Sequence, residues 1–97
     1  MSQRIPDPVP GALLKDILDE MNISQAELAR RTGITASHVT AIIKGRQGIN
    51  AEVSLRLGRF FGQSDTFWLN IQHEYDLRKA RDEKGPQIDK EVLPLAY

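Results

Sequence analysis

Small polar side chains gather in one short stretch near the middle of this chain, and their chemistry suits the edges of nucleic-acid bases. Serine and threonine hydroxyls can hydrogen-bond to several bases, and a small methyl group can touch thymine. In a helix, the apolar members Val39, Ile42 and Ile43 would share the buried face at spacings i, i+3 and i+4. The side chains left for DNA are then Thr35, Ala36, Ser37, His38, Thr40 and Ala41.

This candidate reading surface holds no arginine, asparagine or glutamine that could make a bidentate base contact. We therefore expect the shape of the DNA to carry part of the specificity. Two cations, Lys44 and Arg46, lie at and just beyond the end of the predicted helix and are candidate phosphate contacts. Arg46 could instead enter the adjacent minor groove. Thr35 also suits a helix N-cap, and His38 could be an exposed residue without a role.

A second predicted helix comes just before the reading stretch and would position it. Ser24 and Glu27 have the Ser-x-x-Glu spacing of a capping box, which predicts a helix starting at Gln25. Gly33 can adopt the left-handed conformation that ends this helix, and Thr35 can cap the next one. Two short helices joined by a glycine-containing turn form a helix-turn-helix motif, here predicted at residues 24–45.

Three further helices complete an expected all-α domain at residues 10–84. The first runs from Gly11 to about Met21, the fourth starts after the N-cap Asn50, and the fifth starts after Ser64. Residues 1–10 contain three prolines, and residues 1–9 are expected to form a flexible arm. The predicted inward-facing residues of the three helices are Leu14, Ile17, Leu18, Met21, Val53, Leu57, Phe60, Phe61, Phe67, Trp68, Ile71 and Tyr75.

The end of the fifth helix is predicted just before Gly85 and Pro86, which are poor helix formers. Residues 85–97 would then be a C-terminal tail with several apolar side chains. Three states are open for this tail: it is disordered, it packs on a partner, or it adds an edge strand.

Charge is distributed unevenly, although the chain has no net charge. Residues 24–62 contain six Lys or Arg and two Glu, whereas residues 63–97 contain five Lys or Arg and seven Asp or Glu. A basic middle beside an acidic end is typical of a protein with one DNA-facing surface. An ordinary mixed surface is the alternative explanation.

Several functional classes are disfavoured by composition. The absence of cysteine excludes disulfides and thiolate metal sites, and the two histidines lack metal-ligand spacing. We find no phosphate-binding glycine loop, nucleophile motif or paired carboxylates, so we expect neither an enzyme nor a cofactor. No apolar run is long enough for a membrane span. We therefore expect a soluble cytoplasmic protein without a membrane partner, associated with the nucleoid when it binds DNA.

Three segments together resemble the HigA-type antitoxins, which belong to the Xre family of helix-turn-helix regulators with lambda-repressor-like DNA-binding domains. The first is the Pro10-Gly11-x-x-Leu14 start, and the second is SQAELARRTGITASHVTAIIKG at residues 24–45. The third, GINAEVSLRLGRFFGQSDTFWLNIQHEYDL at residues 48–77, is the most diagnostic. A generic Xre domain needs the second segment but not the F-W-L-N-x-Q part of the third.

This resemblance implies a compact bundle of five helices, usually present as a homodimer. It also implies a repressor that binds double-stranded operator DNA, regulates its own operon and neutralises an mRNA-cleaving toxin of the RelE superfamily. Gln25 matches the residue that contacts phosphate in this family. A stand-alone Xre regulator without a toxin is the main alternative, and a protein-interaction module that does not bind DNA is the third.

Overall fold

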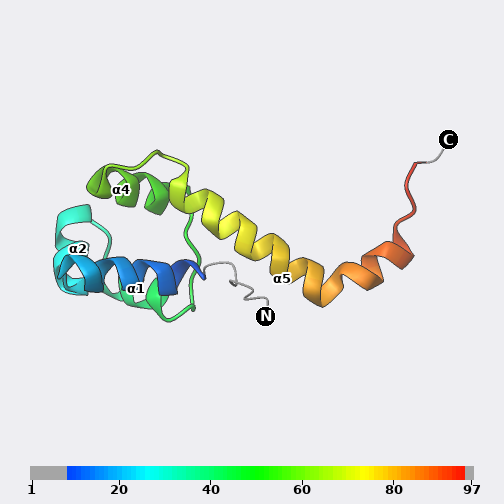
Figure 1. Cartoon of the computed structure of the whole chain (residues 1–97), viewed down its shortest axis with the longest axis horizontal. Coiled ribbons are helices and arrows are strands. Elements are labelled where there is room, and N and C mark those ends of the chain that lie inside the picture. The colour runs from blue at the N-terminus through cyan, green and yellow to red at the C-terminus, as the bar shows by residue number, and fades with distance from the viewer. Residues whose placement is uncertain (1–8, 96–97) are drawn as a thin grey trace, which may run out of the picture.

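The structure is a computed structural model that describes residues 9–95. Within that range the chain forms five α-helices and no β-strand (Figure 1), which confirms the all-α, five-helix prediction. The expected flexible arm lies outside the described residues except for Val9. The helices are α1 (Pro10–Met21), α2 (Gln25–Thr32), α3 (Ala36–Ile43), α4 (Ala51–Phe61) and α5 (Phe67–Glu91).

Side-chain caps start three of these helices where the sequence predicts them. The Ser24 hydroxyl accepts from the Glu27 N–H at 3.0 Å, and the Thr35 hydroxyl accepts from the His38 N–H at 3.2 Å. The Asn50 side chain caps α4 in the same way through the Val53 N–H at 2.9 Å. Each cap satisfies a backbone donor that has no partner within its own helix.

The start of α5 differs from the prediction, because its cap comes from another helix. The helix begins at Phe67, and its own N-cap residue Thr66 makes no side-chain cap bond. Instead, the hydroxyl of Ser54 on α4 accepts from the Leu69 N–H at 3.0 Å and donates to the Asp65 carbonyl at 2.6 Å. Ser54 therefore fixes both the turn before α5 and its first turn.

The core lies where all five helices meet and is built mainly from leucine, isoleucine and valine. The indole of Trp68 on α5 is fully buried and donates to the Gln63 side-chain carbonyl at 2.6 Å. Phe67, predicted to face inward, is instead 37% exposed and packs edge-on against Trp68. The core residues are Leu14, Leu18, Leu28, Ala29, Ile34, Val39, Ile42, Ile49, Val53, Leu57 and Trp68.

Met21 was wrongly predicted to be buried, since its side chain is 52% exposed. The chain turns at Asn22, which has a left-handed backbone (φ 61°), and the Ile23 N–H then bonds to the Leu18 carbonyl at 2.9 Å. This Schellman-type ending directs Ile23 back onto the core. Ile23 therefore supplies the apolar contact that the helical spacing had assigned to Met21.

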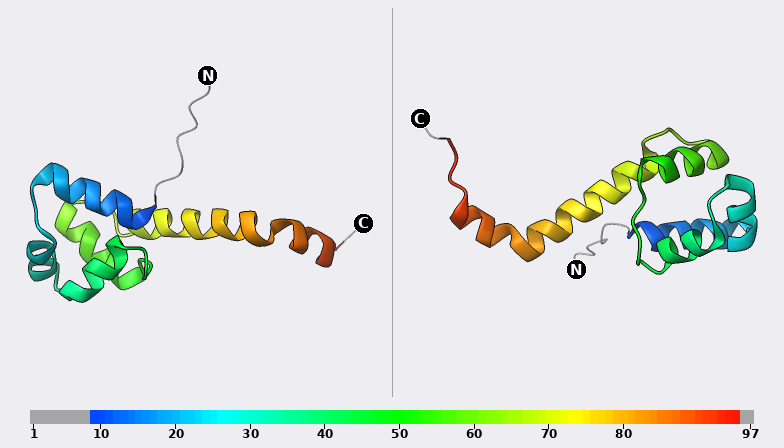
Figure 2. Two further views of the ribbon diagram at one scale, coloured as in Figure 1. Left: turned by 90° about the horizontal axis from the view of Figure 1, so that it is seen from below. Right: turned by 180° about the vertical axis from the view of Figure 1, so that it is seen from behind.

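The C-terminal part of α5 leaves the packed helices and extends away from them (Figure 2). We call residues 10–76 the helical head and residues 77–91 distal α5. Distal α5 and the residues after it expose Leu77, Ile88, Val92, Leu93 and Leu95, each at least 48% accessible. No helix within residues 9–95 combines the length and the apolar character needed to span a bilayer.

The predicted helix end before Gly85 is wrong, because α5 continues through Gly85 and Pro86 to Glu91. Proline removes one backbone donor, and its ring normally clashes with the Cβ of the preceding residue. Gly85 has no Cβ, so this second conflict is absent. The helix therefore bends rather than ends, and the bend lies in the orange part of α5 in Figure 1. Residues 85–91 form neither a disordered tail nor an edge strand.

Candidate nucleic-acid interface

A short turn joins α2 to α3 and sets the angle between them. Gly33 has φ 78°, a backbone conformation that favours glycine, and its N–H bonds to the Ala29 carbonyl at 2.9 Å. The buried hydroxyl of Thr32 donates to the Leu28 carbonyl at 2.7 Å and accepts from the Ile34 N–H at 3.3 Å. These bonds hold α2 and α3 in a helix-turn-helix arrangement.

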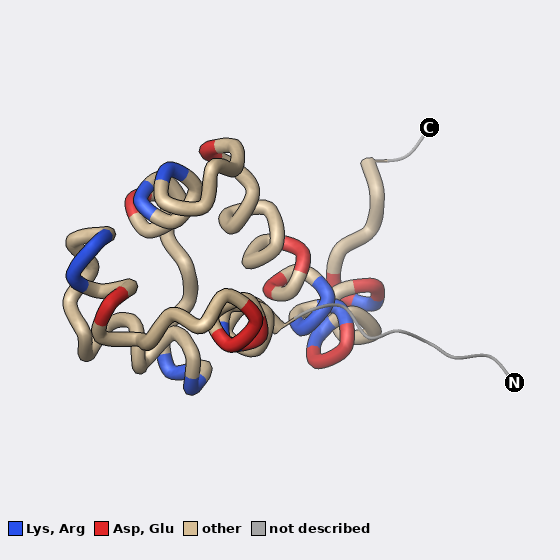
Figure 3. Tube along the Cα trace, turned by 60° about the vertical axis from the view of Figure 1, so that its left-hand side comes forward, with Lys and Arg blue, Asp and Glu red and all other residues tan. Residues whose placement is uncertain are grey.

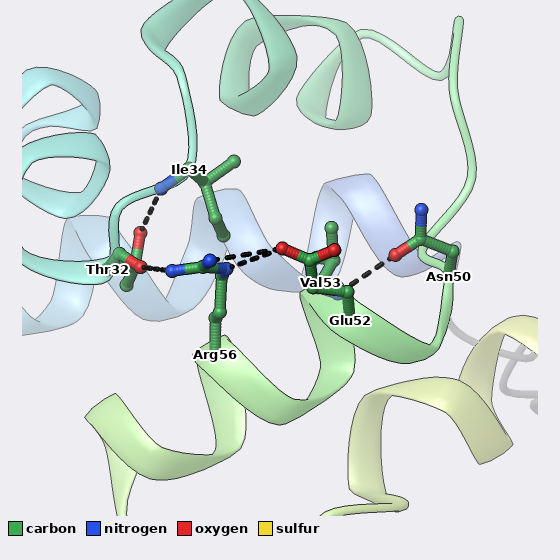
Figure 4. Close-up of polar contacts among 6 residues, drawn as sticks. All are labelled: Thr32, Ile34, Asn50, Glu52, Val53 and Arg56. Carbon is green, nitrogen blue, oxygen red and sulfur yellow. Dashed lines mark hydrogen bonds and ion pairs between the residues drawn. The ribbon is translucent and has the colours of Figure 1, made fainter.

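Arg56 on α4 holds this turn from outside the motif (Figure 4). Its guanidinium donates to the Thr32 carbonyl at 2.9 Å and pairs with Glu52 at 3.0 Å. The guanidinium also lies beside Gly33, where a Cβ would approach it within 2.6 Å. Arg56 thus satisfies a carbonyl at the end of α2 and fixes α4 against the turn.

Two of the six cations in residues 24–62 already have partners within the helical head. Arg56 is engaged at the turn, and Arg31 pairs with Glu27 at 3.3 Å while its guanidinium lies 4.9 Å from the Phe60 ring centroid. Lys44 and Arg46 are exposed, and neither makes an ion pair within residues 9–95. In Figure 3, distal α5 carries interleaved positive and negative residues, so its charges largely offset each other.

Helix α3 separates its buried residues from its polar ones as the periodicity predicts. Val39 and Ile42 are 1% and 2% exposed and face the core. The other side of the helix and its N-cap form one outward surface, which begins at the positive end of the helix dipole. Its exposed members are Thr35, Ala36 and Ser37, and its partly buried members are His38, Thr40 and Ala41.

Gln25 and Thr40 link the first helix of the motif to the second. The Thr40 hydroxyl donates to the side-chain carbonyl of Gln25 at 3.1 Å, across fifteen positions of sequence. Because the carbonyl of Gln25 is occupied by this bond, its NH₂ group keeps its donors available to a partner. An exposed amide donor beside the N-terminus of α2 suits a phosphate oxygen.

Lys44 and Arg46 lie in the turn that follows α3. Gly45 has φ 78°, and the Arg46 N–H bonds back to the Ala41 carbonyl at 2.8 Å. This geometry keeps Arg46 close to the end of α3. The structure therefore brings all nine sequence-predicted residues onto α3, its two ends and the adjoining start of α2.

Sequence reasoning missed two residues that position this surface. Composition shows Arg56 only as one of several cations, but its i, i+4 spacing from Glu52 indicates a helical ion pair. Gln72 on α5 contacts the turn after α3 from twenty-three positions away, and no local pattern predicts that contact. Within residues 9–95, no three His, Asp or Glu side chains cluster as a metal site would require.

Comparison with known proteins places the motif in a family. The Helix-turn-helix family model matches residues 14–69. Virulence-associated protein I of Dichelobacter nodosus is 35% identical over 88 residues, which cover 90% of this chain and 80% of that protein. Antitoxin HigA-1 of Vibrio cholerae is 33% identical over 94 residues, which cover 97% of this chain and 88% of that protein.

A solved structure of a HigA antitoxin is also similar to this chain. The Pseudomonas aeruginosa antitoxin HigA, solved with the higBA promoter, superimposes with a TM-score of 0.87 at 41% identity. The match covers 94% of this chain and all of that one. The chain belongs to the Xre family of helix-turn-helix proteins, in the group of the HigA antitoxins.

Proposed function

We propose that this protein is a sequence-specific DNA-binding repressor and the antitoxin of a type II toxin–antitoxin module. The observation that carries the DNA-binding part is the outward surface of α3, which leaves its small polar side chains accessible while Val39 and Ile42 hold the helix to the core. The HigA antitoxin that was solved with promoter DNA also supports a DNA-binding role for this fold. Such a protein would act in the cytoplasm, on the nucleoid.

In the proposed complex, α3 lies in the major groove, and its first turn is nearest the base edges. Thr35, Ala36, Ser37, His38, Thr40 and Ala41 form the base-facing surface. Gln25, Lys44 and Arg46 bind phosphates on either side of the groove and fix the register of the helix. Because the base-facing side chains are small, sequence-dependent DNA shape contributes to the choice of operator.

The promoter of the chain's own operon is the first DNA to test. A mobility-shift titration should compare the region upstream of the gene with a scrambled duplex of the same length and composition. Tighter binding to the upstream region, by about 1,000-fold or more, is the range expected of specific recognition. Equal affinity for both duplexes would contradict sequence-specific repression.

Arg46→Ala is expected to weaken binding to every duplex and to lower the slope of log affinity against log salt by about one, as the loss of one phosphate contact should. The matched control is Arg81→Ala on distal α5, which removes the same charge far from α3. Its slope should equal that of the wild type. A change in base preference for Arg46→Ala would instead support insertion of Arg46 into the minor groove.

The proposed partner on the protein side is a toxin of the RelE superfamily that cleaves mRNA. The similarity to HigA antitoxins supports this role, and a neighbouring gene for a small basic protein is its expected companion. Co-expression of both genes should yield a complex and should relieve growth arrest caused by the toxin alone. A stand-alone Xre regulator would purify without such a partner, and the neighbouring gene would cause no arrest.

A homodimer is proposed because one α3 reads only a few base pairs. Two copies related by a two-fold axis would place their reading helices in half-sites about 34 Å apart. The exposed apolar side chains of distal α5 and residues 92–95 offer a surface for this contact.

Sedimentation should therefore show a dimer at tens of micromolar. Removal of residues 85–97 should weaken the dimer by at least about tenfold, which is the effect of exposing one large apolar side chain. A monomeric full-length chain at that concentration would contradict the dimer. If the truncated chain dimerises as strongly as the full-length chain, the dimer interface lies outside residues 85–97.

A further inference from the structure

Gln72 is a buried amide on α5 whose two polar ends are both bound. Its side chain is 8% exposed. The carbonyl oxygen accepts from the Ile49 N–H at 2.8 Å, and the NH₂ group donates to the Asp76 carboxylate at 2.9 Å. The first bond joins α5 to the loop between α3 and α4, and the second orients the amide along its own helix.

The loop in question, residues 44–50, carries the two candidate phosphate-binding cations. Most of its side chains are exposed, and only Ile49 is buried. Its first part is tied to α3 by the bond from the Arg46 N–H to the Ala41 carbonyl. Its last part is tied to α5 by Gln72, because a buried N–H at Ile49 needs an acceptor. The loop is therefore held at both ends.

Gly48 allows α5 and the loop to come this close. A Cβ at position 48 would lie 3.1 Å from the side-chain amide of Gln72, which is tighter than an ordinary van der Waals contact. The glycine and the buried amide thus fit each other, and the fit brings the loop within bonding distance of α5. Because the contact spans twenty-three residues, it depends on the folded arrangement of the helical head.

We propose that Gln72 is a positioning residue for DNA binding, which acts by holding loop 44–50 in the conformation that presents Lys44 and Arg46 to phosphates. This inference rests on the proposed DNA-binding function. A loop that is ordered before binding loses less conformational entropy when it meets the DNA than a loosely held one. Gln72 itself touches no DNA in this arrangement, because it is buried under the loop.

The test compares Gln72→Leu with Asn70→Leu in salt-dependent titrations on the operator duplex. The control places the same new side chain at an exposed position on the same helix. Gln72→Leu should lose about tenfold in affinity, comparable to one charge-assisted hydrogen bond, and its salt slope should fall by about one. Asn70→Leu should match the wild type. A folded Gln72→Leu protein with wild-type affinity and slope would overturn the proposal.

A second pair of variants separates positioning from stability. Gln72→Glu keeps the acceptor for Ile49 but faces the Asp76 carboxylate without a donor. Adding Asp76→Asn restores the hydrogen-bond chain with the donor reversed, since the new amide can donate to the new carboxylate. We expect Gln72→Glu to bind weakly and the double variant to recover the wild-type slope. A double variant that protects the Ile49 amide from hydrogen exchange but stays weak would overturn the proposal.

Arg46→Ala links the effect to the loop and separates it from the proposed function. Because Arg46 is one of the two cations that Gln72 is proposed to position, Gln72→Leu should cost less affinity in an Arg46→Ala background than in the wild type. Full additivity of the two losses would overturn the positioning role. If the wild-type protein does not prefer its operator over scrambled DNA, the proposed function itself is refuted. This comparison of the two duplexes is therefore made before any variant is tested.

Discussion

Replacement of Trp68 by alanine is expected to lower the free energy of unfolding by about 3–5 kcal/mol, the usual cost of truncating a large buried aromatic side chain. The indole is fully buried at the start of α5 and lies 6.1 Å from the Phe61 ring, centroid to centroid. Its removal would leave a cavity between α4 and α5 and would deprive Gln63 of its donor. Denaturant unfolding at a fixed protein concentration measures the change, because the proposed dimer would make the apparent stability depend on concentration.

Phe67→Ala is the matched control, since the two aromatic residues are adjacent in sequence but differ in burial. Phe67 is 37% exposed, so its truncation should cost about 1 kcal/mol or less in the free energy of unfolding. Equal losses for the two variants would show that the burial of Trp68 does not anchor α5 to the helical head. A larger loss for Phe67→Ala would point to burial of Phe67 in the proposed dimer.

Ala36→Glu is expected to abolish operator binding while leaving the fold intact or slightly more stable. Ala36 is the exposed first residue of α3, where a carboxylate is favoured by the helix dipole by about 0.3–1 kcal/mol. In the proposed complex the same carboxylate faces the phosphate-lined groove. Juxtaposed like charges cost several kcal/mol, so affinity should fall by at least about 100-fold. Anisotropy titration and thermal unfolding together measure both effects.

Ala36→Glu is informative because it should weaken DNA binding without lowering the stability of the fold. A variant that merely unfolds the protein would lose both its DNA binding and its stability. Ala12→Glu is its control: Ala12 is an exposed alanine in the first turn of α1, whose other exposed residues include Asp16, Asp19 and Glu20. It adds the same charge away from α3, and we expect binding to stay within about threefold of wild type. Wild-type binding by Ala36→Glu would show that α3 does not enter the groove.

Much of the fold could be predicted because its signals are local. The caps Ser24, Thr35 and Asn50 lie within three residues of the backbone N–H groups that they bind, so their spacing appears directly in the sequence. The apolar spacing of α3 is equally local and correctly separated Val39 and Ile42 from the outward residues. These patterns were sufficient to predict the five helices and the helix-turn-helix.

The features that were missed depend on residues that are distant in sequence. The cap of α5 comes from Ser54, fifteen residues before the N–H that it binds, and Arg56 binds a carbonyl twenty-four residues away. Such contacts exist only after the helices have packed. Continuation of α5 through Pro86 was missed for another reason: helix propensity opposes it, but Gly85 lacks the Cβ that would clash with the proline ring.

The residues of the candidate site could be predicted from the sequence, but the contacts between their side chains could not. Helical spacing could place Thr40 on the outward face, yet it could not show that the Thr40 hydroxyl occupies the Gln25 carbonyl. The charge count suggested six available cations in residues 24–62, whereas the structure engages Arg31 and Arg56 in ion pairs within the helical head. Of the remaining four cations, only Lys44 and Arg46 lie in the turn that directly follows α3.

The central claim is that the outward surface of α3 and its flanking residues meet operator DNA. Backbone amide NMR spectra of the full-length protein, recorded during titration with the operator duplex, would map that surface residue by residue. We predict that the largest shift changes fall at Gln25 and at residues 35–46, with distal α5 little affected. Shift changes centred on α1 or distal α5, with α3 unperturbed, would contradict the claim.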